Sequence, residues 1–309
     1  MTGATILVKQ NEDLEIKRLA AMRQLYSEEK WIIGLQFWLA VGGSFGILTW
    51  KSLAPSNSTA AAATGIVISL VDCFILQHLR GKRRKDAAKI QEQFDCDVLD
   101  LSWNRDLIGE ELRPELVIEA AARHPQTGYE SLKNWYLGRL QEVPFEAARI
   151  ICQTTNVAYD RSLRERYIKV LVALVLAIFF TTLIVCIVQK IPTDQWLVNF
   201  IGPLSPILSF SGVQYREHTE VINKISELRT ELQKTWGLCR DSEPGTTELT
   251  RLARNLQNKI FFHRSTGVPL FDKVYWRYRG KQELYGEALA NQMVDEYLKA
   301  KGSDNTKLS

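Results

Sequence analysis

Four stretches of this chain are long, apolar and almost free of ionisable side chains, and they constrain its fold more than any other feature. They cover residues 31–50, 59–79, 170–188 and 196–213. Each is close to the ~20 helical residues that cross a hydrocarbon core of ~30 Å. Because lipid offers backbone groups no hydrogen-bond partner, such stretches cross it as helices. The sequence therefore predicts an all-α membrane protein with four transmembrane helices, arranged as two hairpins.

The four spans differ in how strongly their residues indicate a crossing. Trp31 and Trp50 bracket the first span, and such positions are typical of aromatic residues at the membrane–water interface. The second span contains Asp72, and the fourth contains Asn199 and two prolines that would kink it. A segment of a soluble core is the alternative for the fourth stretch. We retain it as a span because an even number of crossings fits the distribution of charge.

Basic residues set the predicted orientation. Five of them directly follow the second span and four precede the third, whereas the short links 51–58 and 189–195 carry little charge. Lys and Arg accumulate on the cytoplasmic side of a membrane. We therefore expect residues 80–169 and both termini to be cytoplasmic. The basic cluster after the second span is interpreted as a lipid-facing anchor. It lacks interleaved aromatic residues, so no nucleic-acid polymer is expected as a partner.

The remaining segments predict a mostly helical cytosolic domain, built from residues 1–30, 80–169 and 214–301, with a disordered tail at 302–309. An amphipathic helix over 13–30 is expected to continue into the first span. A helix starting near Pro144 is expected to continue unbroken through the third span as a rigid stalk. Residues 99–103 alternate in polarity and predict a short strand or an extended turn.

The chain lacks the motifs of common catalytic sites. It has no glycine-rich phosphate loop, its four histidines are isolated, and its five cysteines have no paired spacing. We therefore expect no enzyme activity, no cofactor, no metal site and no disulfide framework.

The fourth span carries small and polar residues at intervals of three or four. Tight helix packing is one interpretation of this stripe. The other is a narrow aqueous path lined by such groups when four or more copies assemble. The candidate pore-lining residues are Asp72 of the second span, Asn199, Ser205, Ser209 and Arg216. For Asp72 the alternative is a structural hydrogen-bond partner.

The cytosolic motifs carry a family resemblance. They are Gln10-Asn11, RLAAMRQLY (18–26), FDCDVLDLSWN (94–104), NWY (134–136), ICQTTN (151–156) and YDRSLR (159–164). In these motifs, and in their spacing relative to the four spans, the chain resembles the SMODS-associating four-transmembrane effectors. The resemblance covers nearly the whole chain. These proteins are found beside cyclic-oligonucleotide synthases in bacterial antiphage signalling systems (CBASS). One departure is Thr154, where we expect an arginine after Cys152-Gln153.

The resemblance implies a receptor-effector of the bacterial inner membrane. A cyclic di- or trinucleotide would bind the cytosolic part, and a homo-oligomer would permeabilise the membrane and cause abortive infection. Phosphates favour arginine, and bases stack on aromatic rings. The candidate ligand-binding residues are Trp103, Asn104, Trp135, Tyr136, Gln153, Asn156, Arg161 and Arg164. For the tryptophans the alternative is core packing, and for the two arginines it is the cytoplasmic anchor.

Two other function classes stay open on the residues alone. One is a small constitutive channel or transporter, although transporters more often place paired charges near the midplane. The other is a membrane-tethered scaffold whose amphipathic helices bind protein partners.

Overall fold

The computed structural model describes residues 2–53, 58–157, 161–242, 244–269 and 272–307. Within these ranges, the side chains of 51, 52, 58, 161–163, 272–283 and 303–307 are not described. The structure is 86% helical, and the described ranges contain no strand. A single isolated antiparallel bridge joins Thr2 and Pro144. The predicted all-α class is confirmed.

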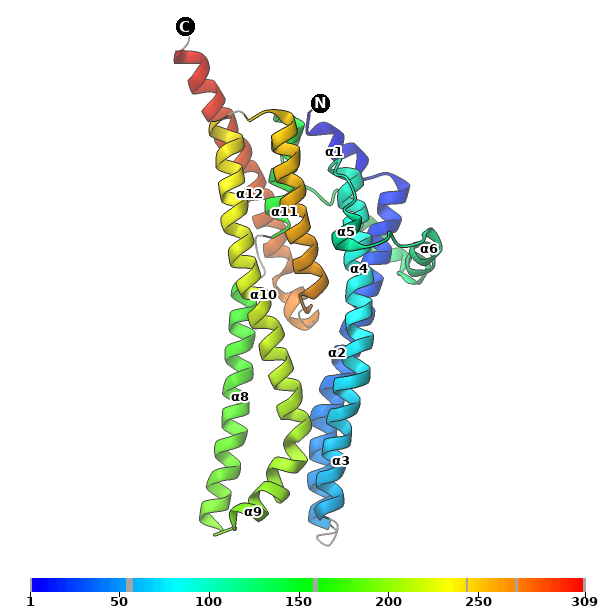
Figure 1. Cartoon of the computed structure of the whole chain (residues 1–309), viewed down its shortest axis with the longest axis vertical. Coiled ribbons are helices and arrows are strands. Elements are labelled where there is room, and N and C mark those ends of the chain that lie inside the picture. The colour runs from blue at the N-terminus through cyan, green and yellow to red at the C-terminus, as the bar shows by residue number, and fades with distance from the viewer. Residues whose placement is uncertain (1, 54–57, 158–160, 243, 270–271, 308–309) are drawn as a thin grey trace. The chain divides into compact units, whose positions relative to one another are not determined.

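The helical elements follow one another along the chain with short links (Figure 1). They are α1 (Ala4–Lys9), α2 (Asp13–Leu53), α3 (Ser58–Val71), the π-helical turn η2 (Asp72–Leu76), α4 (Gln77–Val98), α5 (Arg105–Ile108), α6 (Pro114–Arg123), the 3₁₀ turns η3 (Gln126–Leu132) and η4 (Leu140–Glu142), α7 (Phe145–Thr155), α8 (Arg161–Val188), α9 (Thr193–Trp196), the π-helical turn η5 (Leu197–Ile201), α10 (Gly202–Asp241), α11 (Thr246–Thr266) and α12 (Asp272–Lys307).

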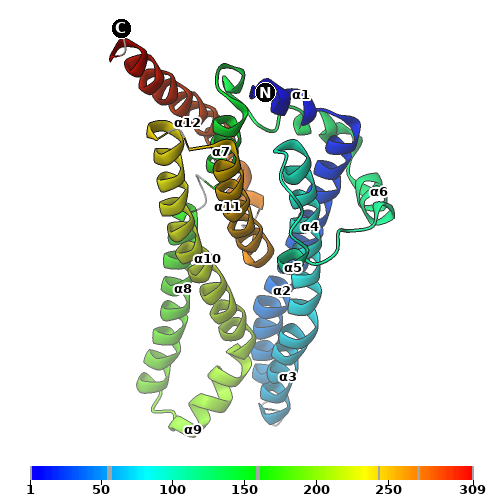
Figure 2. The ribbon, with the colours of Figure 1, turned by 45° about the horizontal axis from the view of Figure 1, so that its top comes forward.

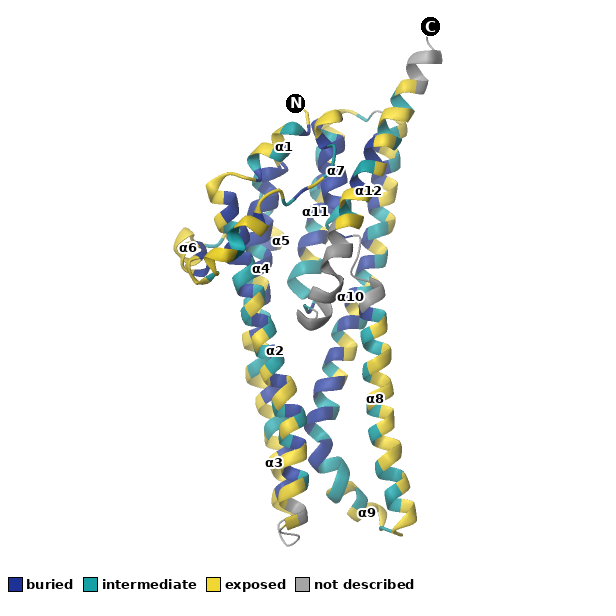
Figure 3. Cartoon of the chain, turned by 180° about the vertical axis from the view of Figure 1, so that it is seen from behind, coloured by how far each residue is buried: buried dark blue, intermediate teal, exposed yellow. Residues whose placement is uncertain are grey.

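Four helical stretches are long and apolar enough to cross a membrane: Asp13–Trp50, Thr59–Val98, Arg164–Val188 and Thr193–Asp241. The prediction of four spans is confirmed, including the fourth. The third span differs from the others in its exposure, because only 6% of its apolar stretch is buried, against 22–28% in the other three. Along α8 the exposed positions therefore dominate (Figure 3). This is the surface that a lipid-facing helix presents.

The chain divides into two compact units. Unit 1 comprises Met1–Ser27, Arg84–Arg161 and Val221–Ser309, and unit 2 comprises Glu28–Arg83 and Ser162–Glu220. Unit 2 holds all four apolar stretches. Helices α2, α4 and α10 each contribute residues to both units.

Unit 2 contains a polar chain that crosses three helices. The carboxylate of Asp72, in η2, accepts a hydrogen bond of 2.7 Å from the Gln36 amide of α2. The oxygen of the same amide accepts one of 3.2 Å from Arg80 of α4. Arg80 also forms an ion pair with Glu217 of α10. Asp72, Gln36 and Arg80 are all buried, which satisfies the rule that polar groups at membrane depth face protein rather than lipid.

Unit 1 has one large hydrophobic core, to which α1, α2, α4, α6, α7, α10, α11 and α12 contribute. A second cluster forms around an apolar stripe of α10. That stripe is buried against Val157 and α11, and its members are Val221, Ile225, Leu228 and Leu232. The amphipathic helix over 13–30 does continue into the first span as α2.

One sequence-based expectation about helices needs correction. The helix that begins after Pro144 is not continuous with the third span, because α7 ends at Thr155. The hydroxyl of Thr155 bonds the carbonyl of Cys152 at 2.9 Å, and such back-bonding competes with helix propagation. Residues 99–103 form a turn and an extended link, which is the second of the two predicted alternatives. Helix α12 extends to Lys307.

The link after α4 begins with a specific cap. Asp100 has a positive φ of 50°, and the N–H of Leu101 bonds the carbonyl of Cys96 at 2.8 Å. This is the Schellman arrangement, in which a left-handed residue ends the helix and lets the next N–H satisfy a terminal carbonyl. The cap directs the link over 101–104 toward α11.

Candidate functional site

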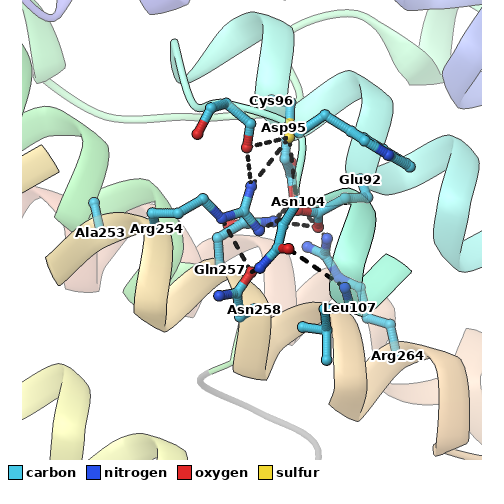
Figure 4. Close-up of polar contacts among 12 residues, drawn as sticks. Glu92, Asp95, Cys96, Asn104, Leu107, Ala253, Arg254, Gln257, Asn258 and Arg264 are labelled. Atoms are coloured by element: carbon cyan, nitrogen blue, oxygen red, sulfur yellow. Dashed lines mark hydrogen bonds and ion pairs between the residues drawn. The ribbon is translucent and has the colours of Figure 1, made fainter. Parts of the chain in front are cut away.

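A buried polar cluster in unit 1 is the strongest candidate for a functional site. It is formed by α4, α7, α11 and the link between α4 and α5 (Figure 4). Glu92 and Asp95 lie three residues apart on α4, and Arg254 and Gln257 lie three apart on α11. Residues at this spacing share a helix face, so each helix presents two polar groups to the other.

Two ion pairs organise the cluster. The Arg254 guanidinium lies 2.6 Å from a carboxylate oxygen of Glu92, and the Arg264 guanidinium lies 2.5 Å from Asp95. Gln257 donates to both carboxylates, at 2.9 Å to Glu92 and 2.8 Å to Asp95. Both carboxylates are completely buried. A buried charge is tolerated only when it is paired and hydrogen-bonded, as it is here.

The surroundings shift the protonation equilibria of this cluster. Burial raises the pKa of Glu92, although Arg254 opposes the shift. Burial acts to lower the pKa of Arg264, but Asp95 and Tyr136 together with Tyr26 oppose it, and the pKa is raised. Burial also raises the pKa of the thiols of Cys96 and Cys152. Protonated thiols are poor nucleophiles, so these cysteines are suited to packing rather than to covalent chemistry.

Tyr136, Gln153 and Asn156, all predicted from the sequence, join this cluster. The Tyr136 hydroxyl donates to Asp95 at 2.6 Å and accepts from the Asn156 amide at 3.0 Å. The Gln153 amide donates to Gln257 at 3.0 Å and to the Ala253 carbonyl at 2.9 Å. Residues of two separate sequence motifs therefore meet in this cluster. Tyr136 and Asn156 are linked to the Asp95 carboxylate, and Gln153 is linked to the Gln257 amide. Helix α7 reaches α11 by direct packing (Figure 2).

Asn104 and Trp103 lie at the edge of the cluster. Asn104 caps α5 by accepting from the N–H of Leu107 at 3.3 Å, and its amide donates to Asn258 at 3.2 Å. Asn258 in turn accepts from Arg254 at 3.1 Å. Trp103 is half-buried and donates to the Gly109 carbonyl at 2.8 Å. Asn104 thus connects the link after α4 to α11.

The other three predicted ligand residues are not part of this cluster as described. Trp135 packs edge-on against Phe94, with ring centroids 6.3 Å apart, and lies 5.7 Å from the Arg23 guanidinium. Arg164 belongs to unit 2, where it contacts His218 at 2.9 Å. The side chain of Arg161 lies outside the described residues.

Comparison with known proteins identifies the family. The sequence model of the SMODS-associating 4TM effector domain matches residues 4–293 of the chain. The chain belongs to this effector family. Among curated proteins, a probable CBASS effector molecule of Bacillus cereus (strain VD146) is 24% identical to this effector over 286 residues. That match covers 90% of this chain and 94% of the relative. No solved structure matches significantly.

Sequence reasoning missed the charged members of the site in this effector. Asp95 stands inside a motif that carried the family resemblance, yet its role became visible only beside Arg264 and Gln257. The polar positions 254, 257 and 264 on α11 recur at helical spacing among apolar residues. This inward-facing polar stripe is the signal that could have identified them.

The predicted pore-lining residues of the effector occupy different environments in unit 2. Asp72 is buried in the polar chain already described, and Arg216 is exposed. Asn199, Ser205 and Ser209 are half-buried. The hydroxyl of Ser205 has no hydrogen-bond partner although it is buried, and a methyl group placed on Gly65 would lie 3.2 Å from it. Among the residues described, no group of three or more His, Cys, Asp or Glu side chains could hold a metal ion.

Proposed function

We propose that this protein is a CBASS membrane effector that binds a cyclic di- or trinucleotide and then permeabilises the bacterial inner membrane. The observation that carries this proposal is the family match over residues 4–293, which includes all four apolar spans and most of unit 1. The probable CBASS effector from Bacillus cereus aligns over 94% of its own length, so the likeness extends to the whole protein. Abortive infection would be the result in the cell.

The charge distribution supports a cytoplasmic unit 1. The basic residues that flank spans two and three lie on either side of the segment 80–169, which belongs largely to unit 1. Positive charge is retained in the cytoplasm. With four crossings, the N-terminus and C-terminus lie on that same side, where a nucleotide messenger is made.

The polar cluster supplies the chemistry for recognition. Guanidinium groups bind phosphates, and amides pair with base edges or sugar hydroxyls. Arg254, Asn258 and Asn104 are linked at the edge of the cluster, and Tyr136 and Asn156 are linked at its centre. A ligand shifts the equilibrium between two conformations only if it binds one of them more tightly than the other. A messenger that pairs with Arg254 would compete with Glu92, and Glu92 lies on the helix that begins in unit 2.

The membrane part supports permeabilisation by several copies. One copy has four spans, which leaves little room for a channel inside it. The exposed face of α8 and the small, polar residues of α10 provide surfaces for packing between copies. In such an assembly Ser209 and Arg216 would line a path, whereas Asp72 would hold the helices of one copy together.

Calorimetric titration of the full-length protein in detergent tests the ligand class. A panel of cyclic di- and trinucleotides is added to the wild type and to Asn104→Ala and Asn156→Ala. We expect at least one nucleotide to bind, with affinity weakened about tenfold in both variants, as loss of one polar contact of about 1.4 kcal/mol implies. Glu248→Gln, in an exposed ion pair with Arg251, is the matched control. Absence of binding across the panel contradicts the proposal.

A further inference from the structure

Arg149 is a buried arginine of α7 whose hydrogen-bonding capacity is only partly used. Only 3% of the residue is exposed, and one terminal nitrogen donates to the Thr250 hydroxyl of α11 at 3.0 Å. The guanidinium carbon lies 4.9 Å from the centre of the Phe145 ring. Its Nε is buried without any hydrogen-bond partner. Arg149 therefore retains donor capacity in the interior of unit 1.

Arg149 also lacks a paired anion, which distinguishes it from Arg254 and Arg264 of the same unit. Arg254 and Arg264 each form an ion pair with a completely buried carboxylate. Within the described part of the chain, no carboxylate lies within ion-pair distance of Arg149. Asp100 and Glu146 influence it only from farther away, and burial lowers its pKa. An unpaired buried charge is strongly unfavourable, so an anion from outside the chain would be bound favourably.

Gln153 provides a complementary orphan group one helical turn away. Residues four apart are neighbours on a helix surface, so Arg149 and Gln153 share one face of α7. The amide nitrogen of Gln153 is engaged by α11, but its oxygen is buried with no partner. An unused donor on a cation and an unused acceptor thus belong to residues on one face of α7. A phosphate with an adjacent hydroxyl or amino group matches this pair.

We propose that Arg149 binds a phosphate group of the cyclic oligonucleotide, and that the Gln153 oxygen accepts a hydrogen bond from the neighbouring sugar or base. This inference rests on the proposed function, because it names the anionic subsite within unit 1. The planar guanidinium of arginine suits phosphate because it offers parallel N–H donors. Because Arg149 is almost fully covered, its cover has to move before a phosphate can reach it. Binding is therefore coupled to a rearrangement around α7.

The stability of variants separates this role from a structural one. In Arg149→Met a side chain of similar length replaces the uncompensated charge with an apolar group. If the arginine serves a ligand, this variant has the same or a higher melting temperature than wild type and binds cyclic nucleotide at least about 30-fold more weakly. Arg149→Lys retains the positive charge but lacks the parallel N–H donors of the guanidinium. We expect this variant to fold and to bind cyclic nucleotide more weakly than wild type does. Arg251→Met, at an exposed position of α11, is the matched control and keeps wild-type affinity.

The experiment measures thermal unfolding and binding of the full-length protein in detergent, with inorganic phosphate, pyrophosphate and the cyclic-nucleotide panel as separate probes. Stabilisation by pyrophosphate that is lost in R149M supports the anion subsite even without a nucleotide. If a cyclic nucleotide stabilises the wild type, phosphate and pyrophosphate do not, and R149M loses the effect, the subsite is specific for the nucleotide. Two results overturn the inference and leave the proposed function standing. One is a lower melting temperature of R149M than of wild type. The other is wild-type affinity for the nucleotide in a folded R149M or R149K variant. Failure of every probe to bind wild type overturns both.

Discussion

At the scale of single residues, Asp95 is the point on which the buried cluster converges. Its two oxygens accept from Tyr136, in the link between η3 and η4, and from Gln257 and Arg264 of α11. Removing one member of a buried charged network leaves the others unpaired. The stability of unit 1 is therefore more sensitive to this residue than to any exposed ion pair on its surface.

Asp95→Ala is expected to destabilise the protein by about 3–5 kcal/mol, because Arg264 is left as an uncompensated buried charge. Thermal or denaturant unfolding in detergent measures the loss. Glu248→Gln breaks an exposed pair and should leave the transition unchanged. Equal effects of the two substitutions would show that the cluster contributes no more than a surface contact.

Glu15 gives unit 1 a pH dependence. Burial raises its pKa to about 7, against the opposing effect of Arg18, and Asp97 adds to the rise. The folded state therefore binds a proton that the unfolded state releases near its ordinary pKa. Stability from this group is greatest below that ordinary value and falls as the pH rises toward 7. We expect Glu15→Gln to flatten the fall in melting temperature between about pH 5 and pH 7. An unchanged pH profile in this variant would contradict the assignment.

At the scale of elements, the membrane spans were predictable and the buried cluster was not. A span is recognised from its local composition. Residues 31–50 and 170–188 can therefore be predicted as spans without knowing which helices pack against them. Glu92 and Arg254, by contrast, are 162 positions apart, and no local pattern pairs them. The end of α7 at Thr155 was missed for a different reason: Thr-Thr-Asn weakens a helix only slightly, and local hydrogen bonds decided the outcome. Tyr136, Gln153 and Asn156 were nominated through family motifs, and their mutual contacts required the fold.

Close packing within unit 2 is testable at a single glycine. A Cβ at Gly65 of α3 would lie 2.8 Å from the carbonyl oxygen of Gly202 at the start of α10, whereas one at Gly46 of α2 would meet nothing within 4 Å. Gly65→Ala should separate these helices and destabilise the protein by about 1–3 kcal/mol, as overpacking does. Gly46→Ala is the matched control and should be neutral or slightly stabilising. Unfolding in mixed micelles measures both, and equal stability of the two variants contradicts the packing of α3 against α10.

At the scale of the whole molecule, the two-unit division and the orientation make a joint prediction. In a cysteine-free background, Asp194→Cys lies in the link between the last two spans, and Asp106→Cys lies in unit 1. We expect a membrane-impermeant thiol reagent on intact cells to label the first and not the second, because the distribution of Lys and Arg predicts a cytoplasmic unit 1. Labelling of Asp106→Cys from outside would reverse the orientation.

Release of a trapped dye from liposomes is the most direct measurement of the proposed function. The full-length protein is reconstituted at several copies per vesicle, and each cyclic di- and trinucleotide is added in turn. We expect no leakage before addition, rapid leakage with the cognate nucleotide, and at least tenfold less with Asn156→Ala at the same concentration. Leakage that begins without any nucleotide, or none with every nucleotide of the panel, contradicts a ligand-gated membrane effector.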